Sequence, residues 1–277
     1  MLPKQDSLMS DAEFTRRVRR IFQALGDKHA GLRFKGKLIR QEDGTPIEIR
    51  PALKEAFKGR QPEIRTSMLE SGYGYILVPG TGRNDAKTIQ QYQDSLCSLD
   101  PENLKGLVID LRLNEGGSIY PMFTGFNQFF GSKTIGYTYG IKGNRMSRLS
   151  VQNGSYYFDK HRIASVVNRC KPQKDLRIVV LTSQITASAG EMLAIAFRGR
   201  DNTLFMGETT SGYITLVSEF NLGNGYLGLS SSFMADRNRN VYTEHFLPDV
   251  EMIEGDNFVD LQADLKVQAA LQWLKKE

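Results

Sequence analysis

Two nearly continuous apolar runs constrain the fold of this chain of 277 residues more than any other feature. They are LKGLVIDLRL at residues 104–113 and LRIVVLTS at residues 176–183, and such runs are typical of strands buried on both faces of a parallel sheet. A helix is expected at about residues 189–198, followed by a third strand, NTLFMGE, at residues 202–208. Strand, helix and strand in this order predict an α/β fold with a largely parallel sheet and right-handed crossovers.

The N-terminal part of the chain differs from this centre. Ser10 and Glu13 form a capping box ahead of a run with apolar residues at helical spacing, and Gly26 supplies the end of the helix. Residues 31–70 are polar and contain turn signals, so we expect a connecting region there rather than a domain. The predicted organisation is a small N-terminal helical segment, residues 1–70, and a core, residues 71–277.

The pattern changes again near the C-terminus. Two β-rich runs meet at Asn224-Gly225, which predicts a late β-hairpin. A final helix is expected to carry four leucines, namely Leu261, Leu265, Leu271 and Leu274.

Composition and charge exclude several classes of protein. The net charge is +5, but most basic residues are scattered. The densest basic run, RRVRR at residues 16–20, fits the solvated face of a helix, so no nucleic-acid partner is expected. No stretch approaches the roughly 20 apolar residues of a membrane span, and no signal peptide is visible at the start of the chain. The two cysteines give no disulfide framework or metal site, and Cys97 is expected to be a small buried apolar residue on a helix.

A serine surrounded by small residues is the first candidate for chemistry. The stretch TASAGEML, residues 186–193, places Ser188 between an apolar strand and a helix. Backbone N–H groups and the dipole at a helix N-terminus can stabilise a developing oxyanion, and small neighbours let a carbonyl group approach. Serine is also a favoured N-cap residue, so the stretch by itself leaves a helix cap and a nucleophile open.

A glycine pair is the second candidate. Gly116 and Gly117 follow the most apolar strand, at the end of the sheet where ligands bind in open α/β folds. Glycine permits positive φ and a close approach of the backbone to a ligand. A simple tight turn is the alternative interpretation.

A nucleophilic serine needs a base, and histidine is the usual one. Of the three histidines, His161 lies in a polar stretch, His245 lies beside Glu244, and His29 follows the N-terminal helix, where its ring can reach a cleft. Glu208, after the third strand, is expected either to orient a base or to face solvent. The histidines lack metal-ligand spacing, so neither a metal nor another cofactor is expected.

Four motifs in their order resemble those of the C-terminal-processing (tail-specific) serine peptidases and their tricorn-type relatives. They are LGDKHAGL, GLVIDLRLNEGG, SQITASAGEML followed closely by FMGETTSG, and FLPDV. The resemblance covers about residues 10–275. It implies a crotonase/ClpP-like β-β-α core and a serine peptidase that hydrolyses polypeptides through an acyl-enzyme.

The resemblance also implies roles for the serine and the glycines. Ser188 matches the nucleophile of the family. The backbone N–H of Ala189 matches one oxyanion donor, and that of Gly116 or Gly117 matches the other.

The base differs between the branches of the family. In the tail-specific branch a lysine in the GETTSGY-like motif is the base, but Tyr213 stands at that position here. In the tricorn-type branch a histidine serves, which implies His29. That branch orients its histidine with a preceding serine, replaced here by Lys28, and with a late glutamate, for which Glu244 and Glu208 are the candidates.

Architecture, location and partners follow from the same resemblance. Many family members carry a PDZ domain after the early motif, but residues 31–70 are too short for one, so none is expected. Relatives are often exported, which implies an extracytoplasmic protein, and a homo-oligomer is compatible with the sequence. Two alternatives stay open: a catalytically inactive ligand- or peptide-binding protein similar to retinoid-binding relatives, and acyl-CoA chemistry on a crotonase-like core.

Overall fold

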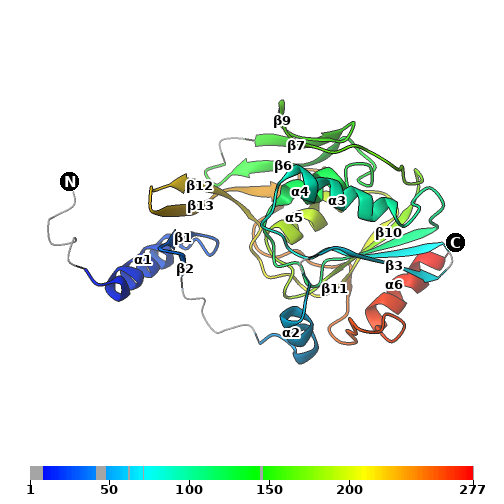
Figure 1. Ribbon diagram of the computed structural model, residues 1–277, viewed down its shortest axis with the longest axis horizontal. Coiled ribbons are helices and arrows are strands. Elements are labelled where there is room, and N and C mark those ends of the chain that lie inside the picture. Colours follow the sequence, from blue (N-terminus) through cyan, green and yellow to red (C-terminus); the bar gives the residue numbers. More distant parts are fainter. Residues whose placement is uncertain (1–8, 42–47, 62, 71, 144–145, 277) are drawn as a thin grey trace. The chain divides into compact units, whose positions relative to one another are not determined.

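The computed structural model describes residues 9–41, 48–61, 63–70, 72–143 and 146–276. Within these ranges the chain forms six helices and the strands of two sheets (Figure 1), which confirms the predicted mixed α/β class. The chain divides into two compact units. Unit 1 comprises residues 1–48 and 215–232, and unit 2 comprises residues 49–214 and 233–277. The division expected at residue 70 stays a prediction.

Unit 1 is built from one helix and short antiparallel strands. Its described elements are α1 (Asp11–Leu25), β1 (Gly31–Phe34), β2 (Lys37–Ile39), β12 (Thr215–Asn221) and the first part of β13 (Gly225–Ala235). Ser10 caps α1 by accepting the Glu13 N–H, and Gly26 follows the helix at a φ of 64°, as the capping pattern predicts. β12 pairs with β13, which confirms the late hairpin.

The core of unit 1 joins two distant parts of the sequence. Phe22 of α1 is buried with Ala30, Leu32 and Ile39, and Leu227 of β13 packs against this cluster. β1 pairs antiparallel with both β2 and β13. Burial of such side chains stabilises a fold by about 1.5–3 kcal/mol each, so this small core fixes the segment after α1 against the hairpin.

Unit 2 contains the parallel sheet that the apolar runs predict. Its strands lie in the order β15, β11, β10, β5, β4, β3. In that order they are Val250–Glu251, Thr203–Gly207, Arg177–Thr182, Gly106–Asp110, Tyr73–Leu77 and Arg65–Glu70. All neighbouring pairs are parallel except β3 with β4. Every residue of β5 is buried, as expected for a strand covered on both faces.

Helices cover this sheet. Leu53 of α2 (Pro51–Lys58) and Leu274 of α6 (Leu265–Lys275) share an apolar cluster with Val108 of β5 and Val179 of β10. Helix α4 (Ile119–Gly125) contacts both α3 (Ala86–Cys97) and α5 (Ala189–Phe197), as Figure 1 shows. All residues of α5 are buried. None of the helices in the described ranges has the length and apolar character needed to cross a membrane.

The end of the chain departs from one expectation. Asp264 caps α6 by accepting the Val267 N–H, and the helix begins at Leu265. The prediction that this helix also carries Leu261 was therefore wrong, because the capping carboxylate starts the helix after that residue.

Four strands of unit 2 form an antiparallel meander that the sequence analysis did not predict. They are β6 (Thr134–Gly140), β7 (Met146–Gln152), β8 (Ser155–Phe158) and β9 (His161–Ser165). The short strand β14 (Val241–Tyr242) pairs with the end of β13. β9 has no buried residue, so it lacks the apolar signal that marks the parallel strands.

A disulfide joins Cys97, the last residue of α3, to Cys170, which lies 73 residues further along the chain. The expectation that Cys97 is only a small apolar residue was therefore wrong. The packing of residues 167–170 on α3 brings the two cysteines together: the side chain of Gln90 donates to the carbonyl of Val167, and Arg169 pairs with Asp94 at 2.9 Å. Cysteine count and spacing carry no sign of this proximity.

Because the disulfide closes a long loop, its removal should favour the unfolded chain. We expect the double variant Cys97→Ser/Cys170→Ser to lose about 2–4 kcal/mol of unfolding free energy in urea titrations. Dithiothreitol should lower the urea midpoint of the wild type and leave that of the double variant unchanged. Equal midpoints of the two proteins in oxidising buffer would contradict the cross-link.

Candidate active site

Ser188 lies at a sharp turn between β10 and α5. Its backbone has φ 50° and ψ −113°, a conformation that few non-glycine residues adopt and that costs of the order of 1–3 kcal/mol. It occupies the N-cap position of α5 without the extended backbone usual for a capping serine. A strained serine at a strand-to-helix turn is the arrangement that exposes the nucleophilic hydroxyl of α/β-hydrolases.

The carboxylate of Glu191 holds this turn in place. It accepts the backbone N–H groups of Ser188, Gly212 and Tyr213, each at 2.8 Å, and the hydroxyl of Thr210. Glu191 is fully buried. Burial raises the pKa of its carboxyl group, against the opposing effect of these four hydrogen bonds. One side chain therefore fixes both the serine turn and the loop of residues 210–213.

Gly116 lies directly against the serine. A Cβ atom on Gly116 would lie 2.7 Å from the Ser188 Cβ, and a Cβ on Gly190 would lie 2.8 Å from the carbonyl oxygen of Asn114. Asn114 binds both segments, because its Oδ1 accepts the Gly116 N–H at 3.0 Å and its carbonyl accepts the Ala187 N–H at 2.9 Å. The small residues around Ser188 thus make room for the glycine turn to pack against it.

Two backbone donors in this region are not used within the part of the chain that the structure describes. Neither the N–H of Gly117 nor that of Ala189 has an acceptor there, whereas the N–H of Gly116 is bonded to Asn114. Ala189 is the first residue of α5, and the first N–H groups of a helix lack intrahelical partners. Unused backbone N–H groups of this kind can stabilise negative charge on an oxygen atom.

His29 lies in unit 1, between α1 and β1, and is partly buried. Its Nδ1 atom is 3.0 Å from the hydroxyl oxygen of Thr215. Burial and the positive charge of Arg40 lower the pKa of His29 to about 4, against the opposing effects of the Thr215 backbone and the Asp27 carboxylate. The imidazole is therefore neutral at neutral pH, which is the form that accepts a proton.

Three polar residues near His29 were missed in the sequence analysis. The Thr215 hydroxyl is 2.8 Å from that of Ser230, which donates to Asp27 at 2.6 Å. Thr215 lies 186 residues after His29, and hydroxyl residues are common in strands, so nothing in the sequence marks this group. Asp27 stands two residues before His29 and was the one local signal available.

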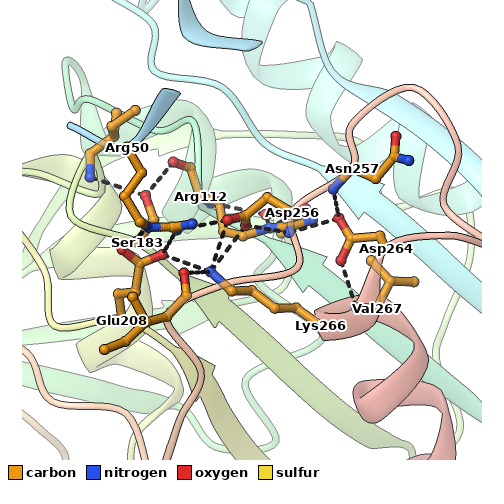
Figure 2. Close-up of polar contacts among 12 residues, drawn as sticks. Arg50, Arg112, Ser183, Glu208, Asp256, Asn257, Asp264, Lys266 and Val267 are labelled. Carbon is orange, nitrogen blue, oxygen red and sulfur yellow. Dashed lines mark hydrogen bonds and ion pairs between the residues drawn. The ribbon is translucent and has the colours of Figure 1, made fainter. Parts of the chain in front are cut away.

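Glu208, a predicted orienting acid, lies in a buried ion cluster (Figure 2). Its carboxylate pairs with Arg50 and with the Lys266 ammonium group, the latter at 2.6 Å. Lys266 also pairs with Asp256 at 3.0 Å. Arg50 and Lys266 are separated from Glu208 by 158 and 58 residues, so sequence reasoning could not foresee these contacts.

Arg112 occupies the centre of the same cluster (Figure 2). Its fully buried guanidinium pairs with Asp110 at 2.6 Å and with Asp256 and Asp264 at 2.8 Å. The hydroxyl of Ser183 donates to the Arg112 carbonyl at 2.6 Å. Buried charges of this kind are destabilising unless they are paired, and the paired cluster anchors both the strand before the glycine turn and the segment before Ser188.

The other candidate residues are Glu244 and two histidines. Glu244 is exposed between β14 and β15, and His161 is exposed in β9. The Nδ1 atom of His245 is 2.7 Å from the Thr210 carbonyl oxygen. Within the described ranges, no three or more His, Cys, Asp or Glu side chains are arranged to hold a metal ion. The roles expected for Glu208 and Glu244 as acids that orient the base stay predictions, and so does a substrate-binding role for Tyr213, which stands at the lysine position of the tail-specific branch.

Comparison with known proteins gives relatives of the expected kind. The nisin-resistance protein of Lactococcus lactis subsp. lactis is 27% identical over 203 residues, which are 73% of this chain and 60% of that protein. The carboxy-terminal processing protease CtpA of Bacillus subtilis (strain 168) is 29% identical over 150 residues, which are 54% of this chain and 28% of that protein. The chain thus spans less than two thirds of the length of these curated relatives.

A solved structure and a family model complete the comparison. A lipoprotein from Streptococcus agalactiae has a similar fold, with a TM-score of 0.71 and 23% identity over 98% of this chain and 84% of that chain. The model of peptidase family S41 matches residues 72–252, which is more than half of the chain. On this match, and with its serine and glycine turns in place, the chain belongs to peptidase family S41.

Proposed function

We propose that this protein is a serine-type peptidase that cleaves polypeptides through an acyl-enzyme formed on Ser188. The observation that carries the proposal is the strained turn at Ser188, packed against Gly116 and held by Glu191. A cap alone gives no reason for this backbone strain, whereas a nucleophile must be presented to a substrate carbonyl. Membership of peptidase family S41 supports the same reaction class.

The proposed reaction assigns each step to a group of this chain. His29 takes the hydroxyl proton as Ser188 Oγ attacks the peptide carbonyl carbon, and the carbonyl oxygen becomes an oxyanion. The N–H groups of Gly117 and Ala189 stabilise that oxyanion. The C–N bond then breaks as the imidazolium returns the proton to the leaving amine. A water molecule, deprotonated by His29, then attacks the ester carbonyl carbon, the bond from that carbon to Ser188 Oγ breaks, and the carboxylic acid product leaves. The imidazolium returns the proton to Ser188 Oγ.

The connectivity of the chain supports a joint role for the serine and the histidine. Tyr213 donates its N–H to Glu191, which also binds the Ser188 N–H. Only Ile214 separates Tyr213 from Thr215, which bonds the His29 ring. The same short stretch of chain therefore bonds both the carboxylate that holds the Ser188 turn and the His29 ring.

We also propose the type of core fold, the location of the protein and the class of its substrate. The order of strands and helices in unit 2 supports a crotonase/ClpP-like core. The disulfide between Cys97 and Cys170 supports an extracytoplasmic location, since disulfides persist in oxidising compartments. The two curated relatives described above, a carboxy-terminal processing protease and a nisin-resistance protein, support a polypeptide as the substrate.

Replacement of the nucleophile gives the first test of this function. Ser188→Ala should lower kcat/KM for peptide hydrolysis by roughly 10³-fold or more and abolish labelling by a fluorophosphonate. Ser165→Ala, which changes an exposed serine of β9, is the matched control and should behave like the wild type. Undiminished hydrolysis by Ser188→Ala would refute the assignment, and a protein that binds peptides without labelling or hydrolysis would be a binding protein.

The pH dependence tests His29 as the base. Because the neutral ring is the active form, kcat/KM should fall as the pH drops through the His29 pKa of about 4, rather than near the ordinary value of roughly 6.5. Removing the positive charge in Arg40→Gln should raise that pKa and move the acid limb to higher pH. Lys37→Gln, an exposed change on β2, should leave the limb in place. An acid limb of the wild type near pH 6.5 would count against this assignment.

The turn that presents the serine should depend on the Glu191 carboxylate. The amide of a glutamine cannot accept all four hydrogen bonds, so we expect Glu191→Gln to lose about 2–3 kcal/mol of unfolding free energy and to react more slowly with the serine probe. Glu102→Gln, at an exposed glutamate, is the control. Unchanged stability and labelling of Glu191→Gln would show that the turn does not need the carboxylate.

A further inference from the structure

A continuous chain of polar contacts runs from the His29 ring to a carboxylate within unit 1. His29 Nδ1 lies 3.0 Å from Thr215 Oγ1, and Thr215 Oγ1 lies 2.8 Å from Ser230 Oγ. Ser230 Oγ lies 2.6 Å from Asp27 Oδ1. His29 and Asp27 precede β1, Thr215 begins β12, and Ser230 lies in β13, so the pairing of these strands assembles the chain of contacts.

Asp27 is the last residue in this series of contacts, and it acts only as a hydrogen-bond acceptor. Its Oδ1 atom accepts the backbone N–H groups of His29 and Ala30, each at 3.1 Å. Its Oδ2 atom accepts the backbone N–H of Ser230 at 2.8 Å. Backbone N–H groups can only donate, and an ionised carboxylate can only accept. The Ser230 hydroxyl therefore donates its proton to Asp27 in a charge-assisted hydrogen bond.

Because Ser230 donates to Asp27, the positions of the remaining hydroxyl and ring protons are fixed. Ser230 has one hydroxyl proton and donates it to Asp27, so its oxygen accepts from Thr215. Thr215 in turn has one hydroxyl proton and donates it to Ser230, so its oxygen must accept from the histidine. The His29 Nδ1 atom is then the protonated ring nitrogen, and the lone pair lies on Nε2.

We propose that Asp27, acting through Ser230 and Thr215, fixes His29 as the Nδ1–H tautomer and so makes Nε2 the atom that takes the proton. This inference rests on the proposed function. Asp27, Ser230 and Thr215 are positioning residues, because they act on the reaction only through the His29 ring. They supply the orientation expected from Glu244 or Glu208, and they do so where Lys28 has replaced the serine that precedes the histidine in the tricorn-type branch.

This series of hydrogen bonds from Asp27 through Ser230 and Thr215 to His29, here called the relay, also accounts for the orientation of the ring. Asp27 binds the backbone N–H of His29 as well as Ser230, so the same carboxylate holds the main chain and, through two hydroxyls, the side chain. When Nε2 takes a proton, the imidazolium charge is stabilised by Asp27 through short polarised hydrogen bonds. A single carboxylate can thereby serve both before and after the proton transfer.

Nitrogen-15 NMR of the histidine rings tests the tautomer without relying on catalysis. We would record it at pH 7 on the full chain carrying Ser188→Ala, and assign signals with His161→Gln and His245→Gln. His29 Nδ1 should appear as a protonated nitrogen and Nε2 as an unprotonated one. His245, whose Nδ1 faces the Thr210 carbonyl, provides an internal reference for the same tautomer. A His29 ring protonated on Nε2 instead would overturn the relay.

Variants at Thr215 test whether the relay causes that state. Thr215→Val removes the side-chain acceptor of the ring proton and leaves only the backbone of residue 215, so Nδ1–H should lose population and kcat should fall by about 10- to 100-fold, with a smaller change in KM. Thr215→Ser should restore both, and Ser231→Ala, a neighbouring serine whose hydroxyl donates to the Leu216 carbonyl, should change neither. An unchanged tautomer in Thr215→Val would overturn the relay, whereas absent hydrolysis by the wild type would refute the proposed function and leave the NMR result to decide the relay.

Discussion

The buried carboxylate of Glu191 is the interaction on which the serine site depends. It gathers three backbone N–H groups and one hydroxyl, and these come from the turn at Ser188 and from the loop of residues 210–213. Taking a carboxylate out of water is costly unless hydrogen bonds compensate for it. The four hydrogen bonds to Glu191 tie the Ser188 turn and the loop of residues 210–213 to the first turn of α5. The strained backbone of Ser188 persists because these hydrogen bonds hold it in place.

Ser188 and His29, the two groups proposed to react, are organised by different kinds of interaction. The serine turn of unit 2 rests on Glu191, on Asn114 and on a core of paired buried charges around Arg112. The histidine of unit 1 rests on hydroxyl groups that lead to Asp27. In both places a carboxylate fixes the geometry of a group that is proposed to react. Preorganisation of this kind is where much of the rate enhancement of enzymes arises.

Local sequence patterns predicted the elements that carry strong signals, and missed contacts that depend on tertiary packing. The apolar runs of β5 and β10, the caps of α1 and the hairpin at Asn224-Gly225 each contain their own signal. Within the meander β6–β9, which was not predicted, β9 lacks such a signal because it buries none of its residues. Small residues made Ser188 a candidate, and the resemblance of four ordered motifs selected it over a helix cap. Thr215 and Ser230 are ordinary strand residues whose contacts with His29 and Asp27 form only when β12 and β13 meet the segment after α1.

The central claim is that Ser188 carries the acyl group of a cleaved peptide. The most direct measurement is rapid acid quench during turnover of a peptide substrate, followed by intact-mass and peptide mass spectrometry of the protein. We expect a transient adduct with the mass of the acyl portion of the substrate, located on Ser188 and absent from Ser188→Ala. Peptide hydrolysis that proceeds with no adduct on Ser188, or with the adduct on another residue, would contradict it.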